Sequence, residues 1–204
     1  MINIIEPRFF EEEEEAILSI LKSRKITRGE WTKAFEEAFA KYLGVKHAFT
    51  VCSGTVALFI ALKALGVEGQ KVVVPAMSFM ATIDAVYLAG GVPVVVDVDE
   101  YYTMDPNQLE DAVKKYNPKV VIPVHLYGQP ADMDAIMELS EKYGFYVLED
   151  SAQAHGAEFK GKKVGSLGHL SAFSFYASKN VPMGEGGVIA TDDDKLAKEV
   201  KKWI

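Results

Sequence analysis

Cysteine is nearly absent from this sequence: Cys52 is the only one, so no intrachain disulfide can form. Apolar runs are short, and none approaches the length that crosses a membrane. The first residues lack the basic start and apolar core of a signal peptide, and they lead into five glutamates at positions 11–15. We therefore expect a soluble, cytoplasmic protein without a membrane partner.

Positive charge is also scarce. Lysine and arginine number 22 against 29 aspartates and glutamates, which gives a formal net charge of −7. Proteins that bind nucleic acid need clustered cations, so we expect no nucleic-acid partner. Hydrophobic residues make up 49% and charged residues 25% of the 204 positions. That balance is typical of a soluble globular protein with one sizeable core.

Several common cofactor and metal motifs are missing as well. The turn at residues 53–55 does not belong to a nucleotide-binding P-loop, which ends in Gly-Lys-Ser/Thr. A Gly-Glu-Gly-Gly run at 184–187 precedes an apolar strand, whereas a dinucleotide-binding loop follows one. No HExxH or other spacing of metal ligands is present, so we expect no metal ion.

Short apolar runs alternate with helical patterns along the chain. The patterns predict strands at residues 48–51, 71–75, 92–98, 120–124, 145–149, 170–175 and 187–191. They predict helices at residues 11–22, 31–43, 54–66, 81–89, 106–116 and 132–143. This alternation is typical of an α/β fold with three layers, in which a mostly parallel, mixed sheet lies between helices.

Three polar clusters follow predicted strands, at residues 53–55, 149–151 and 174–179. In sheets of this kind, ligands bind at the carboxyl ends of the strands. The amides after Gly54 could bind an anion at a helix start, or Ser53 could simply cap the helix. Asp150 could face the crevice or cap a loop. Lys179 could be a buried amine with a lowered pKa or a surface lysine.

Taken together, the three clusters favour the functional interpretation. An enzyme that uses pyridoxal 5'-phosphate (PLP) needs an amine for the aldehyde, an acid beside the pyridine nitrogen and a pocket for the phosphate. Lys179, Asp150 and the turn at Gly54 offer these three groups at three strand ends of one sheet.

Five segments, in this order, carry a family resemblance: FEEAFAKYLGVKHAFTVCSGTVAL, VPAMSFMATIDAV, IPVHLYGQPADMDAI, EDSAQAHGA and SFYASKNVPMGEGG. With them, essentially the whole chain resembles the DegT/DnrJ/EryC1/StrS family. Its members are PLP-dependent aminotransferases that act mostly on nucleotide-linked keto sugars. The resemblance implies the fold-type I architecture of aspartate aminotransferase, with PLP as cofactor.

The resemblance also implies roles for individual residues. Lys179 matches the lysine that bonds the cofactor as a Schiff base and later carries the proton. Asp150 matches the acid that pairs with the pyridinium nitrogen, and Gln153 matches a residue near the phenolic oxygen of the ring. Phe79 holds the position of the stacking aromatic residue, which is tryptophan or tyrosine in many relatives. Gly54, Thr55 and Ser174 match the residues that hold the phosphate.

Other residues receive plainer interpretations. His125 and His155 are expected to be structural, Cys52 to be a small buried residue, and Glu185 to stabilise its loop. His169 stands where relatives often carry aspartate, and the sequence assigns it no consequence.

Family members are about twice as long as this chain. The resemblance therefore implies that residues 1–204 form the PLP-binding large domain, with a helical arm over about residues 1–45 and without the C-terminal small domain. It also implies a homodimer.

Two functions remain open at this stage. The first is transfer of an amino group, with glutamate as the donor, to a nucleotide-linked keto sugar. The second is a truncated or split family member that binds PLP or dimerises without turnover, with a separate polypeptide as its C-terminal domain. A PLP-dependent sugar dehydratase is disfavoured, because such relatives carry histidine in place of the lysine that Lys179 matches.

Overall fold

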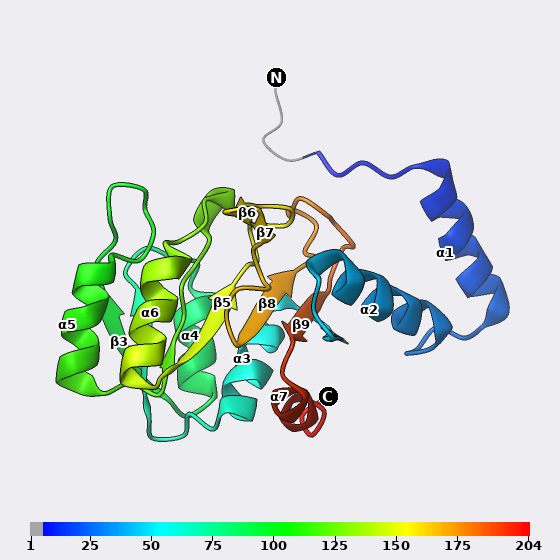
Figure 1. Cartoon of the computed structure of the whole chain (residues 1–204). Helices are drawn as coiled ribbons and strands as arrows, with labels where there is room; N and C mark the ends of the chain where they lie inside the picture. Colours follow the sequence, from blue (N-terminus) through cyan, green and yellow to red (C-terminus); the bar gives the residue numbers. More distant parts are fainter. Residues whose placement is uncertain (1–5) are drawn as a thin grey trace.

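A seven-stranded sheet forms the middle of the protein, whose computed structural model describes residues 6–204 (Figure 1). The strands lie in the order β1-β9-β8-β5-β4-β2-β3. They are β1 (His47–Val51), β2 (Lys71–Pro75), β3 (Val92–Val96), β4 (Val120–Val121), β5 (Tyr146–Asp150), β8 (Leu170–Ser174) and β9 (Gly187–Thr191). In this sheet, as far as the structure describes it, β9 runs antiparallel to its two neighbours, β1 and β8, and the other pairings are parallel. The predicted mixed, mostly parallel sheet is confirmed.

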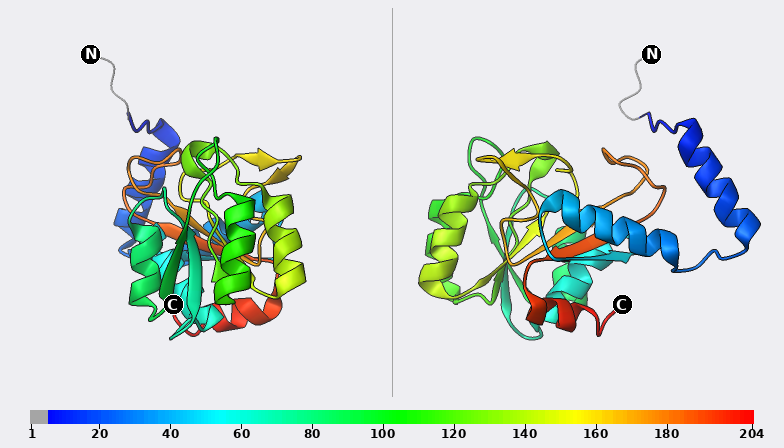
Figure 2. Two further views of the ribbon diagram at one scale, coloured as in Figure 1. Left: turned by 90° about the vertical axis from the view of Figure 1, so that its left-hand side faces the viewer. Right: turned by 45° about the vertical axis from the view of Figure 1, so that its right-hand side comes forward.

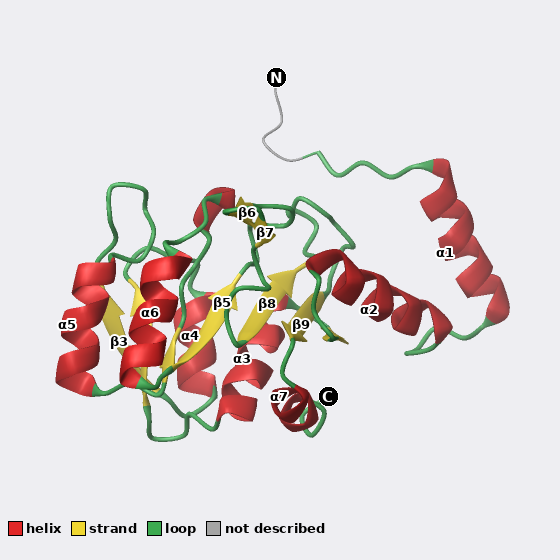
Figure 3. Cartoon of the chain, in the orientation of Figure 1, coloured by secondary structure: helices red, strands yellow, loops and turns green. Residues whose placement is uncertain are grey.

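Helices cover both faces of the sheet, as Figures 2 and 3 show. On one face lie α3 (Gly54–Leu65), α4 (Ala81–Leu88) and α7 (Asp194–Val200). On the other lie α2 (Glu30–Leu43), α5 (Pro106–Tyr116) and α6 (Met133–Tyr143). Side chains of a strand alternate between the faces, so Val72 and Val74 pack in the α3 core while Val73 packs in the α5–α6 core. Because both faces are buried, the strands read as continuous apolar runs.

The predicted arm contains two helices that differ in packing. Helix α1 (Glu11–Ser23) has no buried residue and extends away from the sheet (Figure 1). Helix α2 packs Phe39 against Phe173 and Phe175, with edge-to-face rings 5.1 Å and 5.5 Å apart. Residues 1–5 of the predicted arm lie outside the described residues.

One strand is shorter than the sequence predicts. The run at residues 120–124 forms a ladder only over Val120–Val121, and Val124 makes an isolated bridge with Asp150. Pro123 lies between them and has no N–H to donate, although its carbonyl accepts from the Asp150 N–H at 2.9 Å. The ladder is therefore interrupted just before the segment that leads into the site.

The patterns missed four short elements: the 3-10 turn η1 (Leu126–Gly128), the hairpin of β6 (Glu158–Phe159) and β7 (Lys162–Lys163), and helix α7. Elements of two or three residues are too short to show a period, and the seven residues of α7 make fewer than two helical turns. Across residues 6–204, no helix combines the length and the apolarity that a bilayer crossing requires.

Candidate active site

A cavity of about 430 Å³ lies at the sheet edge where β1, β5 and β8 end; we call it the strand-end cavity. Because β9 is antiparallel to both β1 and β8, the carboxyl ends of β1, β8 and β5 fall on the same edge. All seven residues predicted to hold the cofactor line this cavity: Gly54, Thr55, Phe79, Asp150, Gln153, Ser174 and Lys179. It also contains residues to which the sequence assigned no role, among them Ser78, Thr82, Tyr176 and Ser178.

The acid of the cavity is buried. Asp150 is the last residue of β5 and is only 5% exposed. Burial raises the pKa of its carboxyl group, while hydrogen bonds from the Thr82 hydroxyl and the Ala152 N–H act in the opposite direction. Each carboxylate oxygen accepts one of these bonds, at 2.7 Å and 3.2 Å. Asp150 therefore lines the cavity with a carboxyl group whose orientation is fixed by two hydrogen bonds, and it does not act as a loop cap alone.

The amine of the cavity, Lys179, is half-buried in the segment after β8. Burial lowers its pKa, and the negative charge of Asp150 partly offsets this effect. A lowered pKa raises the fraction of neutral amine, which is the nucleophilic form. The amine and the acid thus lie in one cavity and influence each other's ionisation.

Two glycines leave no room for a side chain at the turn between β1 and α3: Gly54, where α3 begins, and Gly187, at the start of β9, which packs against the turn. A Cβ on Gly54 would lie 2.7 Å from the Cβ of Ser174, and one on Gly187 would lie 2.3 Å from the Ser53 carbonyl oxygen. The Ser53 side chain caps α3 by accepting from the Val56 N–H at 3.2 Å. Within the described chain, the N–H groups of Gly54 and Thr55 make no hydrogen bond. The start of α3 is thus both capped and able to bind an anion.

Two side chains complete the walls of the cavity. Phe79, just before α4, is 68% exposed, so its ring is available to stack on a flat ligand. The Gln153 side-chain oxygen accepts from the Tyr127 N–H at 3.0 Å, which leaves its NH₂ group to donate. Tyr127 holds this position with φ of 54°, in the left-handed region. The residues present fit a planar anion that carries a phosphate, an aldehyde and a ring nitrogen.

A buried network lies beside the cavity. Glu149 is fully buried and accepts from the N–H groups of Gly165, Leu167 and Gly168 at 2.6–2.8 Å. His125 lies 3.1 Å from Glu149 through Nε2, while its Nδ1 accepts from the Ala131 N–H. His125 therefore donates to Glu149, and its predicted structural role is confirmed.

Two of the other three histidines, His155 and His169, pack against strands of the sheet. The His155 ring lies 5.3 Å from Phe173 and 5.0 Å from Phe175, and burial lowers its pKa to about 4. His169, to which the sequence assigned no consequence, joins strands: its Nδ1 accepts from the Val147 N–H, and its carbonyl accepts from the Thr191 hydroxyl. Its ring thus supports the base of β5, away from the strand-end cavity.

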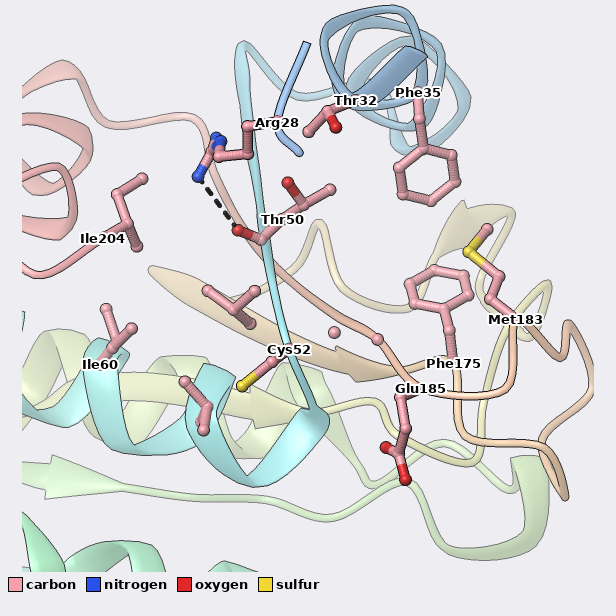
Figure 4. Close-up of a pocket in the computed structure, with 14 residues that line it drawn as sticks. Arg28, Thr32, Phe35, Thr50, Cys52, Ile60, Phe175, Met183, Glu185 and Ile204 are labelled. Carbon is pink, nitrogen blue, oxygen red and sulfur yellow. Dashed lines mark hydrogen bonds between the residues drawn. The ribbon is translucent and has the colours of Figure 1, made fainter. Parts of the chain in front are cut away.

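A second cavity, of about 590 Å³, lies beside edge strand β1 and is called here the arm cavity (Figure 4). Arg28, Thr32 and Phe35 line it from the arm. Cys52 is exposed there, so the expectation of a buried cysteine was wrong; it follows the end of an edge strand, where the cavity opens. Glu185 lines both cavities and makes no hydrogen bond to any described residue, so its predicted loop-stabilising role was also wrong.

Comparison with known proteins decides the family. Residues 7–203 match the model of the DegT/DnrJ/EryC1/StrS aminotransferase family. The chain belongs to this family. Pyridoxal phosphate is the cofactor of the family, and the fold of this member is the fold-type I arrangement that the resemblance implied.

Curated relatives include sugar-modifying enzymes. The chain is 40% identical over 203 residues to GDP-perosamine synthase of Caulobacter vibrioides, which covers 98% of this chain and 54% of that protein. It is 41% identical over 197 residues to the spore coat polysaccharide biosynthesis protein SpsC of Bacillus subtilis, with 96% and 50% covered. This DegT/DnrJ/EryC1/StrS chain thus spans about half the length of the curated relatives it matches.

Solved structures of similar proteins share its fold. An aminotransferase from Psychrobacter cryohalolentis superposes with a TM-score of 0.92 at 37% identity, over 97% of this chain and 51% of that one. DesV of S. venezuelae, solved with a ketimine intermediate, gives a TM-score of 0.86 at 39% identity, over 94% and 53%.

Proposed function

We propose that this chain is the cofactor-holding part of an aminotransferase that moves an amino group from glutamate to a nucleotide-linked keto sugar. The observation that carries the proposal is the convergence of Lys179, Asp150 and the Gly54 turn on one cavity. The names of relatives support the substrate class: GDP-perosamine synthase, and the dTDP-3-amino-3,4,6-trideoxy-alpha-D-glucose transaminase of Streptomyces venezuelae.

Bound PLP supplies an aldehyde that bonds amines and a ring that accepts electrons from the carbon bearing the amino group. Lys179 supplies the amine, and burial lowers the pKa of its Nζ, which raises the fraction of the neutral, nucleophilic form. When it is not bonded to the cofactor, the same nitrogen could accept a proton and return it. Asp150, held as a carboxylate by two donors, stabilises positive charge on the group that faces it.

The remaining residues bind and orient the cofactor. The first amides of α3, with the Thr55 and Ser174 hydroxyls, offer donors to the phosphate. The Phe79 ring covers one face of a flat ligand, a contact worth about 0.5–1.5 kcal/mol beyond burial. The Gln153 NH₂ group donates to an oxygen on the ring.

The cofactor claim is tested by mixing the purified chain with PLP. We expect a yellow protein whose visible absorbance is lost in Lys179→Ala and kept in Lys25→Ala, an exposed lysine of the arm. A chain that stays colourless in excess PLP would refute the proposal. Turnover is a separate measurement: glutamate should bleach the colour and release 2-oxoglutarate. A yellow chain that releases none would be a cofactor-binding protein without activity of its own.

We also propose that the protein is a cytoplasmic homodimer. Four large apolar side chains just before α4 and at its end are 63–68% exposed: Phe79, Met80, Tyr87 and Leu88. Large apolar side chains left exposed at both ends of α4 favour an interface there, and a two-fold axis would bring the same face of a second copy against them. Sedimentation at micromolar concentration measures the assembly, and a monomer there would contradict the dimer. A lone, reduced cysteine suits the cytoplasm.

A further inference from the structure

Thr82 is a buried polar residue to which the sequence assigned no role. It is 1% exposed, sits in the first turn of α4 and lines the strand-end cavity. Its hydroxyl oxygen lies 2.7 Å from Oδ2 of Asp150 and 2.5 Å from the hydroxyl oxygen of Ser78. Asp150 is 68 positions away in the sequence, so this contact joins the start of α4 to the end of β5.

The direction of these hydrogen bonds follows from counting protons. A threonine hydroxyl has one proton, and an ionised carboxylate can only accept. With Asp150 ionised, Thr82 donates to Oδ2 of Asp150, and the oxygen of Thr82 is left to accept from Ser78. The Ser78 hydroxyl also lies 3.2 Å from the Phe79 carbonyl oxygen, a longer contact than the one to Thr82. The hydrogen bonds thus run from Ser78 through Thr82 to Asp150. When Asp150 is ionised, each of the two hydroxyl groups in this series has an acceptor for its proton.

Thr82 is the side chain that donates to Asp150 in the part of the protein that the structure describes, and the second donor is the backbone N–H of Ala152. Charged or titratable groups that act on Asp150 are Lys179, after β8, and His125, after β4. Hydrogen bonds to a charged group contribute more than those between neutral groups, most of all in a buried site. Loss of the Thr82 hydroxyl would leave Oδ2 without its donor.

The same turn carries the aromatic wall of the cavity. Phe79 precedes Thr82 by three positions, and the Thr82 N–H donates to the Phe79 carbonyl at 3.0 Å. Fixing Thr82 against Asp150 therefore also fixes the backbone of Phe79 relative to the acid.

We propose that Thr82 is a positioning residue that keeps Asp150 ionised and aimed at the ring nitrogen of the bound cofactor, and that ties the Phe79 wall to it. This inference rests on the proposed function for the identity of the ligand. The hold of Thr82 on Asp150 is a property of the chain itself and can be measured without the cofactor.

The test compares two substitutions, each of which changes one of the two groups on the Cβ of Thr82. Thr82→Val deletes the hydroxyl and keeps the shape, whereas Thr82→Ser keeps the hydroxyl. Carboxyl-carbon NMR of the chain without cofactor should show a higher Asp150 pKa in Thr82→Val than in wild type, because the carboxylate has lost a donor. Thr82→Ser should restore the wild-type value. PLP should bind Thr82→Val about tenfold more weakly, and Thr82→Ser within about twofold of wild type.

A matched control separates this effect from general destabilisation. Thr191→Val removes an equally buried hydroxyl, 3% exposed, that donates to the His169 carbonyl away from the cavity. It should lower the thermal unfolding temperature while leaving the Asp150 pKa and the PLP affinity unchanged. If Thr82→Val does not fold, Ser78→Ala can be used instead. It removes the hydrogen bond from Ser78 to Thr82 and should raise the Asp150 pKa by less than Thr82→Val does.

The proposal is overturned if the Asp150 pKa of Thr82→Val matches wild type, or if Thr82→Val and Thr82→Ser bind PLP within twofold of each other. A wild-type chain that binds no PLP would instead refute the proposed function. In that case the titration of Asp150 still decides whether Thr82 holds the acid ionised.

Discussion

The two cavities share a wall but are built differently. The strand-end cavity collects polar groups from three strand ends, and Asp150 and Gln153 each accept a hydrogen bond from a distant segment. The arm cavity is lined mostly by apolar side chains (Figure 4). Its one arginine, Arg28, pairs with Glu36 at 2.7 Å. Glu185 borders both cavities. The strand-end cavity is therefore the better candidate for an active site, because hydrogen bonds fix the orientation of its polar side chains. The arm cavity is space between packed elements.

The difference traces to the sheet. Strand β1 leads directly into the turn that begins α3, so its carboxyl end contributes to the strand-end cavity. Its free edge faces the arm, where Glu36 accepts from both the N–H and the hydroxyl of Thr50 at 2.7 Å. One strand thus serves a binding site at its end and an arm contact along its edge.

Gly187→Ala should have the largest effect on the strand-end cavity. The new Cβ would lie 2.3 Å from the Ser53 carbonyl oxygen and 2.9 Å from the Gly54 nitrogen, so the backbone of the turn must move. We expect roughly 3 kcal/mol of lost stability and loss of PLP binding, measured by urea unfolding and by absorbance titration.

The neighbouring glycine is the control for this prediction. A Cβ on Gly186, which lines the arm cavity, would meet the Phe175 Cβ at 3.4 Å, an ordinary contact. Gly186→Ala should therefore keep PLP binding. Equal losses of binding in the two variants would mean that the Gly187 contact has no special part in the turn.

The sequence predicted those features of the two cavities that depend on the local pattern of apolar and polar residues. Apolar runs located every strand of the main sheet, and polar residues after those runs located Asp150 and Lys179. It could not predict that Thr82 donates to Asp150, because the partners are 68 positions apart and threonine is common at helix starts. The exposure of Cys52 was missed for a related reason: the apolar run before it indicates a strand and does not show that the strand lies at an edge.

Glu36→Ala should lower stability without changing PLP binding in the strand-end cavity, and its effect should be smaller than that of Gly187→Ala. One oxygen of Glu36 accepts from Arg28 and twice from Thr50, and the Glu36 side chain is 17% exposed. Its loss leaves the edge of β1 without this acceptor, which we expect to cost about 1–3 kcal/mol in urea unfolding.

Glu37→Ala, one position along on the exposed side of α2, should change stability by less than about 0.5 kcal/mol. Because Glu36 acts on the edge of β1 and not on its end, PLP affinity should stay within twofold of wild type in both variants. A large loss of PLP affinity in Glu36→Ala alone would mean that the arm contact sets the geometry of the Gly54 turn, and that the two cavities form one coupled site.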